Sequence, residues 1–161
     1  MVNNKYNFKY LYKIKYYNSL FYNFSNKFIG KIIKKGNKER SLQFYFKLKY
    51  MLKKKTKRDP NLILLVSLIK SMFKFYFIKL RLGSIQKDIP MPLSKIRQVR
   101  FVVKELIKLA RYKRKNSLNI NKLGNLILLT SKRQGPLIIK NNKNYRKALN
   151  NRSFLFFKRK K

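Results

Sequence analysis

Lysine and arginine are the side chains with the most chemistry to offer in this sequence. The 161 residues include 43 Lys and Arg against 4 Asp and Glu, a formal net charge of +39. Such a charge repels itself in a compact state unless an external anion neutralises it. The chemistry indicated is therefore the binding of a polyanion, which could be nucleic acid, an anionic membrane or an acidic protein.

Catalysis, by contrast, has few side chains to work with. Histidine, cysteine and tryptophan are absent, so the chain has no imidazole base, no thiolate nucleophile and none of the nitrogen and sulfur ligands of zinc. Paired-carboxylate or two-metal chemistry would need distant acids to converge, because Glu39, Asp59, Asp88 and Glu105 are scattered singly. We expect no enzyme activity, no catalytic residue, no metal site, no cofactor and no small-molecule substrate.

A folded domain should nevertheless carry these cations. Hydrophobic residues make up 45% of the chain, too many for a disordered polycationic tail. The length fits one domain. The most apolar run, residues 62–69, ends at Lys70 and is too short to span a bilayer, so no membrane insertion is expected.

Hydrophobic spacing in the first half predicts three helices. One lies around residues 28–33 and stops before Gly36, and a second runs over residues 39–53. Residues 53–58 are almost all Lys and Arg and are predicted to form a solvated or phosphate-bound loop. A buried helix should begin at Asp59-Pro60, with Asp as N-cap and Pro in the first turn.

The period changes after Met72. Residues 74–79 are aromatic and β-branched, residues 85–93 are a second extended segment, and a turn with Gly83 lies between them. This pattern predicts a β-hairpin whose second arm, carrying Pro90 and Pro92, is an exposed edge. A long irregular loop is the alternative.

A basic amphipathic helix is the clearest element of the second half. It should run from Ser94, as N-cap, to about Lys113, with an apolar face and an opposite row of cations. Another helix is expected around residues 123–130, a break at Gly135-Pro136, and a last basic helix over about residues 142–156. The predicted fold class is mainly α, a bundle of about six helices with one protruding β-hairpin and basic terminal extensions.

Several motifs, taken in this order, resemble small-subunit ribosomal protein seven. The matching features are the opening helix and Gly turn at residues 27–38, the Arg and Gly of the hairpin turn with Ile89-Pro90 in the returning arm, and Ala110-Arg111 late in the basic helix. The C-terminal pattern is met by Gly135, Lys140, Ala148, Asn151, Arg152, Ser153 and Phe154. The chain departs from the family where Gln98 replaces the second of paired arginines and Glu105 an aromatic residue.

The resemblance implies a structural constituent of the small ribosomal subunit that binds rRNA of the head, the 3′ major domain. It places the hairpin near the exit-site tRNA and the mRNA path, and implies neighbouring ribosomal proteins of the head and platform as partners. On this basis residues 1–25 are a basic aromatic extension, residues 26–157 the rRNA-binding domain with its hairpin at about 73–93, and residues 158–161 a basic tail.

Candidate binding residues fall on three surfaces and the hairpin. The rRNA-binding candidates are Lys34, Lys35, Lys38, Lys53, Lys54, Lys55, Lys57, Arg58, Arg97, Arg100, Lys104, Lys108, Arg111, Lys113 and Arg114. The hairpin-tip candidates near tRNA and mRNA are Lys79, Arg81, Gly83 and Lys87. Tyr and Phe in the first twenty-four residues could stack on unpaired bases or pack on a neighbouring protein.

The abundance of Lys, Asn, Ile, Phe and Tyr is typical of AT-rich coding sequence, which favours a mitochondrial ribosome, with a plastid or an AT-rich bacterial cytoplasm as alternatives. Two other classes share the charge. A histone-like general nucleic-acid binder needs no hairpin or ordered C-terminal pattern. A peripheral protein of anionic membranes would use its basic amphipathic helices on lipid.

Overall fold

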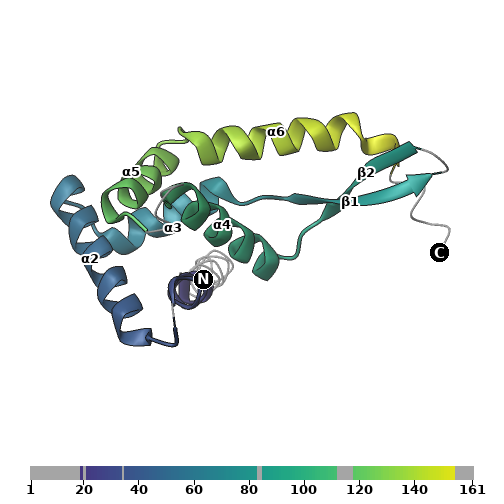
Figure 1. Cartoon of the computed structure of the whole chain (residues 1–161). Helices are drawn as coiled ribbons and strands as arrows, with labels where there is room; N and C mark the ends of the chain where they lie inside the picture. The colour runs from purple at the N-terminus through teal and green to yellow at the C-terminus, as the bar shows by residue number, and fades with distance from the viewer. Residues whose placement is uncertain (1–18, 20, 34, 83–84, 112–117, 155–161) are drawn as a thin grey trace, which may run out of the picture.

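Helices gather at one end of the molecule and a hairpin projects from the other (Figure 1). The computed structural model describes residues 19, 21–33, 35–82, 85–111 and 118–154. Within them lie a helix at residues 21–32 and a further series of elements: α2 (Lys38–Thr56), α3 (Pro60–Ser71), β1 (Phe75–Leu82), β2 (Ile85–Pro92), α4 (Lys95–Ala110), α5 (Ile120–Ser131) and α6 (Pro136–Asn150). The predicted fold class, mainly helical with one antiparallel hairpin, is confirmed.

The first helices begin where capping side chains allow. Asn37 accepts a hydrogen bond from the Arg40 amide at 3.1 Å and starts α2, and Asp59 accepts from the Asn61 amide at 3.0 Å and starts α3. Each cap satisfies an amide that has no partner inside its helix. The prediction that Asp59-Pro60 opens a helix is confirmed, whereas the helix expected at residues 28–33 already begins by residue 21.

The predicted loop at residues 53–58 is wrong in its first half. Lys53, Lys54 and Lys55 form the last turn of α2, and the chain leaves the helix only at Lys57, whose φ of 54° is left-handed. Cations are favourable at a helix C-terminus because the carbonyl ends of the peptide dipoles point there. A run of lysines is therefore compatible with the end of a helix as well as with a loop.

The hairpin has the predicted strands and turn position. β1 and β2 pair antiparallel from Phe75 opposite Pro92 to Leu82 opposite Ile85. Both strands of a two-stranded sheet are edge strands. An edge strand can hold prolines such as those of β2, because some of its N–H positions face solvent and need no partner strand. The expectation of an exposed second arm is wrong at Ile89 and Pro90, which are buried beside Asp88, where Asn151 of the C-terminal segment donates to the Asp88 carbonyl at 3.0 Å.

Three helix boundaries in the second half differ from the sequence prediction, and one of them is the end of α6, at Asn150 instead of about residue 156. α4 ends at Ala110, three residues early, because Arg111 turns to an extended conformation and bridges Leu118. α6 begins at Pro136, six residues early. Gly135 takes a φ of 94°, and Pro136 then occupies the first turn, where a fixed φ and a missing N–H cost nothing. The glycine-proline pair starts the last helix instead of merely interrupting the chain.

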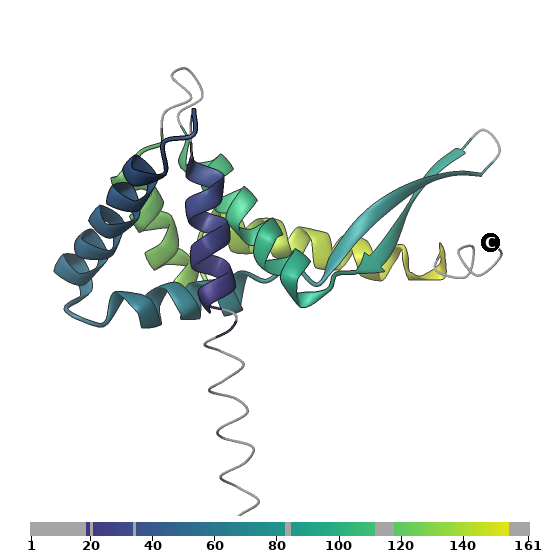
Figure 2. The ribbon, with the colours of Figure 1, turned by 90° about the horizontal axis from the view of Figure 1, so that it is seen from below.

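The core forms where α5 packs on α2, α3, α4 and α6. Fully buried leucines, isoleucines and valines of these helices meet phenylalanines of the first helix: Phe24, Phe28, Leu48, Leu64, Leu68, Val102, Leu106, Leu123 and Ile127. α2 and α5 approach closely, since a Cβ on Gly124 would stand 1.9 Å from the Met51 methyl carbon. Figure 2 shows the helix of residues 21–32 beside α4 and the hairpin directed away from this body.

A hydrogen bond between side chains joins the helix of residues 21–32 to α2. Ser25 and Tyr45 share a hydrogen bond of 3.0 Å between their hydroxyls. Burial raises the pKa of the Tyr45 hydroxyl above its ordinary value of 10.0, against the smaller opposite effect of the Ser25 hydrogen bond. Tyr45 is therefore neutral at physiological pH and joins the core as an apolar ring with one satisfied hydroxyl.

Two leucines of α3 test this description of the core. Leu64 is fully buried and Leu62 is 59% exposed. We expect Leu64→Ala to lower the free energy of unfolding by about 2–5 kcal/mol, since it removes core contacts and leaves a cavity. Leu62→Ala, the matched control, should change it by less than about 0.5 kcal/mol. Urea titration followed by circular dichroism in phosphate buffer measures both, and equal effects would contradict the assignment of faces.

Candidate nucleic-acid interface

A row of cations covers the outer face of α4. Arg97, Arg100, Lys104 and Lys108 are exposed, at successive spacings of three and four residues. The opposite face is buried and consists mainly of Val99, Val102, Val103, Leu106, Ile107 and Ala110, as the sequence predicts. Repulsion along such a row destabilises an isolated helix. The buried stripe compensates within the fold, and phosphate would remove the repulsion.

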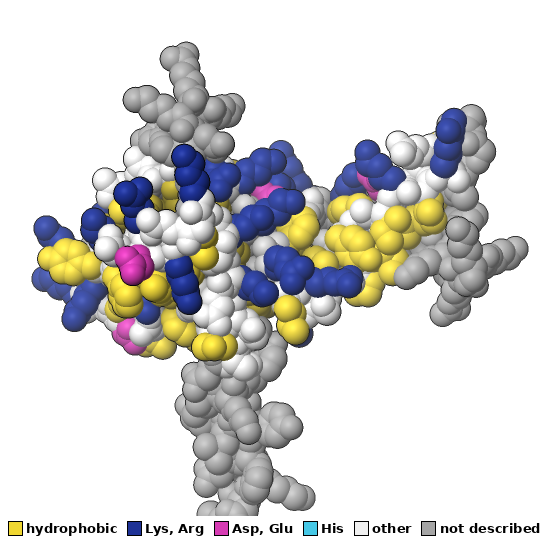
Figure 3. Space-filling model, turned by 60° about the horizontal axis from the view of Figure 1, so that its bottom comes forward, with side chains coloured by type: hydrophobic (Ala, Val, Ile, Leu, Met, Phe, Trp, Pro, Cys, Tyr) yellow, Lys and Arg dark blue, Asp and Glu magenta, His cyan; other side chains and the backbone are white. Residues whose placement is uncertain are grey.

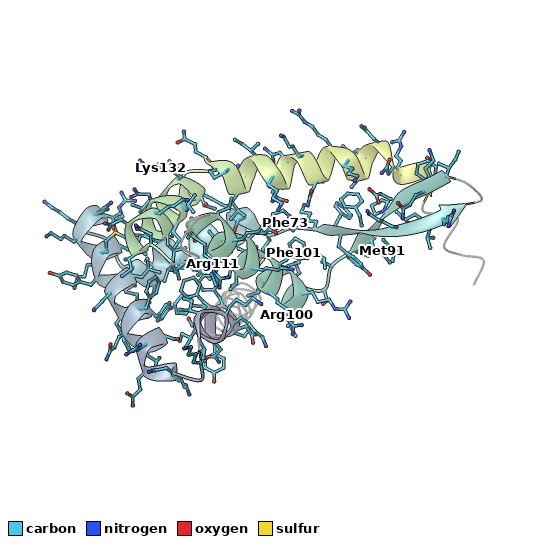
Figure 4. All side chains as sticks on the ribbon, viewed as in Figure 1. Phe73, Met91, Arg100, Phe101, Arg111 and Lys132 are labelled. Carbon is cyan, nitrogen blue, oxygen red and sulfur yellow. The ribbon has the colours of Figure 1, made fainter. Side chains whose placement is uncertain are left out.

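Figure 4 shows two neighbouring residues of α4, one on the cationic face and one packed inward. The Phe101 ring packs on Phe73 at the start of the hairpin segment, with ring centroids 5.3 Å apart, while Arg100 is exposed. Arg111, the fifth member of the predicted row, lies beyond the helix end and is half-buried. Lys113 and Arg114 lie outside the described residues.

Two further predicted clusters are exposed at the ends of α2. At its start, Lys35 has a φ of 50° beside Gly36, and Lys38 begins the helix; Lys34 lies outside the described residues. At its end, the exposed cations are Lys53, Lys54, Lys55, Lys57 and Arg58. Lys55 donates to the Asn125 side chain of α5 at 2.8 Å, so part of this cluster also joins two helices.

The hairpin candidates are spread along the strands instead of gathering at the tip. The pair nearest the turn is Leu82 opposite Ile85. Arg81 is exposed and lies one pair before it, and Lys79, opposite Asp88, lies three pairs before it. The Lys87 ammonium lies 5.2 Å from the centre of the Phe154 ring, so Lys87 is directed toward the C-terminal segment. Gly83 lies outside the described residues.

All four acids lie at the start of a helix or in an ion pair between two elements. Glu39 is in the first turn of α2 and Asp59 caps α3. Glu105, with 8% of its side chain exposed, accepts from Lys140 at 2.6 Å and joins α4 to α6, and Asp88 pairs with Lys147 and joins the hairpin to α6. None of these acids is paired with the α4 cations in the described part of the chain, so that row is left to an external anion.

A cleft between the helical body and the base of the hairpin adds cations that the sequence does not single out. Its walls come from α3, the strand ends, α4 and α6, and include Lys70, Lys74, Lys95 and Arg133. The first turn of α4 borders it, and Ser94 makes no side-chain cap there. These residues are far apart in sequence, so only the packing brings them together.

Two buried polar residues of α4 also escape sequence reasoning. Gln98 donates to the Leu93 carbonyl at 2.8 Å and fixes the end of the hairpin to the start of α4, and Glu105 makes the ion pair with Lys140. Both lie at positions where the sequence departs from the pattern of the family that it resembles, small-subunit ribosomal protein seven. The only signal was that each is a polar residue within the apolar stripe of the helix.

The face seen in Figure 3 carries many Lys and Arg side chains and few Asp or Glu among the described residues. Among the residues described, no group of three or more metal-binding side chains occurs. In the same residues no helix has the length and hydrophobicity needed to cross a bilayer. Exposed rows of Lys and Arg on a rigid helical body, with a projecting hairpin, are the features of a protein that binds a large polyanion by shape.

These features define a class, the basic helical proteins that bind structured RNA. A family model described as ribosomal protein S7p/S5e matches residues 3–152. The chain belongs to this family of ribosomal proteins, which are structural and not enzymes. As a member, it is a constituent of the small ribosomal subunit that binds rRNA and other ribosomal proteins.

The contacts of α6 with the hairpin can be tested by a charge-matched pair. Lys147 makes the ion pair with Asp88 and lies 4.8 Å from the centre of the Phe77 ring. Lys143, one turn earlier and equally exposed, makes no ion pair among the described residues. We expect Lys147→Met to speed amide hydrogen exchange in β1 and β2 several-fold, because α6 loses one of its attachments to the strands. Lys143→Met removes the same charge and should leave it unchanged. Equal exchange in both variants would show that the pair does not restrain the hairpin.

Proposed function

We propose that the protein binds rRNA of the small-subunit head, the 3′ major domain, and supports assembly and translation there. The observation that carries the proposal is the exposed α4 row, which has no acidic partner among the described residues, together with the family membership. The hairpin would lie near the exit-site tRNA and the mRNA path. Partners would be rRNA, ribosomal proteins of the head and platform, and transiently tRNA and mRNA.

Binding would be driven by release of counterions. Each Lys or Arg that replaces a condensed cation on the RNA backbone adds affinity that depends on salt and little on sequence. Specificity would then come from fit, since RNA helices are recognised through shape, phosphates and 2′-hydroxyls. The rigid spacing of the cations on α4 and at the ends of α2 suits such recognition.

The ribosome in question would be mitochondrial. The support is compositional: lysine, asparagine and the large apolar residues predominate as in AT-rich coding sequence. A plastid or an AT-rich bacterium would give the same bias. The division into an extension at residues 1–25, a domain at 26–157 and a tail at 158–161 stays a prediction.

The α4 row provides the sharpest test of how rRNA is bound. Replacing Arg97, Arg100, Lys104 and Lys108 together by Gln keeps the buried stripe. We expect the slope of log affinity for small-subunit rRNA against log salt to fall by roughly three to four, since about one counterion is released per phosphate contact.

The matched control replaces four exposed cations outside the proposed surfaces with Gln: Lys132, Lys143, Arg146 and Arg152. It changes the net charge equally and should have a much smaller effect on the slope. Filter binding over a salt series measures both variants, and circular dichroism checks that both fold. Equal slopes in the two variants would mean that net charge, and not the α4 face, binds the RNA.

The location of the protein is tested by purifying native particles and mapping RNA cross-links. We expect the protein to sediment with small ribosomal subunits and to cross-link to the 3′ major domain of their rRNA. Association with DNA alone would support the histone-like alternative. Liposome binding that persists after RNase treatment, without rRNA cross-links, would support the membrane alternative.

A further inference from the structure

The outer side of α2 carries two aromatic rings that are largely exposed to solvent. Phe46 is 62% exposed and Tyr50 is 71% exposed, while Tyr45, Leu48 and Leu52 of the same helix are buried. Side chains four residues apart are neighbours on one helix face, so the two rings lie side by side on the surface opposite the core. Contiguous exposed apolar patches mark interaction sites, whereas single exposed apolar residues are common.

The ring of Phe46 lies near the ring of its neighbour in the helix. Its centroid lies 6.4 Å from that of the buried Tyr45, at a tilt of 56°. Tyr45 in turn is fixed by its hydrogen bond to Ser25. Tyr45 thus holds the helix that carries Phe46 and Tyr50 to the core.

Cations lie on the next turn of the same face. Lys53 and Lys54 follow Tyr50 by three and four residues, and both are exposed in the last turn of α2. They reach this position because residues 53–55 continue the helix instead of forming a loop. The acid of α2, Glu39, lies at the opposite end of the helix.

Rings beside lysines select a particular kind of ligand. Unpaired nucleotides present a π face and a phosphate at each step, and aromatic side chains next to a cationic track bind them with little sequence preference. A protein partner fits less well, because lysine is depleted from the cores of protein interfaces. The charge beside the rings is thus complementary to RNA.

We propose that this face of α2 binds two unpaired nucleotides of RNA, with bases stacked on Phe46 and Tyr50 and phosphates on Lys53 and Lys54. The proposal rests on the proposed function, since it takes RNA as the partner. It adds a site for single-stranded RNA to a surface otherwise suited to helical backbone. A loop or bulge of the rRNA would supply the nucleotides.

The experiment uses the full-length chain with two probes, a short oligouridylate and an RNA duplex with the same number of phosphates. Fluorescence anisotropy is measured at a salt concentration at which both probes still bind the unaltered chain. We expect Phe46→Leu and Tyr50→Leu each to weaken oligouridylate binding about fivefold to thirtyfold. Tyr50→Phe should bind as the unaltered chain does, because it keeps the π face, and duplex binding should not change.

Leu62→Ala is the control for loss of an exposed apolar side chain away from this face, because Leu62 is 59% exposed on α3. It should bind oligouridylate normally. Unchanged oligouridylate binding in Phe46→Leu and Tyr50→Leu would overturn the site, as would an equal loss of duplex binding. If those variants instead lose a neighbouring ribosomal protein from the particle, the face is a protein interface. Sedimentation with small subunits tests the proposed function separately, since the unaltered chain should retain it even if the stacking site fails.

Discussion

Uncompensated positive charge is the constraint on which this structure depends. With 43 cations and 4 acids, most cations cannot find a partner within the chain. The fold keeps them on outer faces, where water screens their repulsion, and reserves a continuous apolar interior for α3, α5 and the inner faces of α2 and α4. RNA then supplies the counter-charge that the sequence lacks. Binding and relief of repulsion are the same physical event.

The four acids stabilise helix starts and join separate elements of the fold. Two are at helix starts, where a carboxylate offsets the exposed amides, and two make ion pairs with α6. Because Glu105 and Asp88 lie on α4 and β2, α6 is attached both to the helical body and to the hairpin. An aromatic contact between Phe75 and Tyr145, at 6.1 Å, adds to the second attachment. The hairpin is thereby held at a fixed attitude to the cationic face of α4.

Local patterns in the sequence predict most of the elements but not their long-range contacts. The three- and four-residue spacing of α4, the Asp-Pro start of α3 and the change of period at β1 are each encoded by adjacent residues, so the fold class could be predicted. The burial of Gln98 and Glu105 depends on partners five and thirty-five residues away. The cleft with Lys70, Lys74, Lys95 and Arg133 depends on packing alone, and no spacing in the sequence indicates it.

At the end of α2, the incorrect prediction of a loop hides the fixed positions of two lysines. As a loop, residues 53–58 would be a loose cluster of charges. As the last turn of α2, residues 53–55 instead place Lys53 and Lys54 at fixed positions relative to Tyr50. A mobile cluster contributes affinity that depends on charge alone, whereas a rigid one can also select the spacing between a base and its phosphate. If the proposed stacking site on α2 binds RNA, helical order at this point turns part of the surplus charge into geometric selectivity. In a protein with so many cations, specificity has to arise from such fixed positions, because charge by itself does not distinguish one polyanion from another.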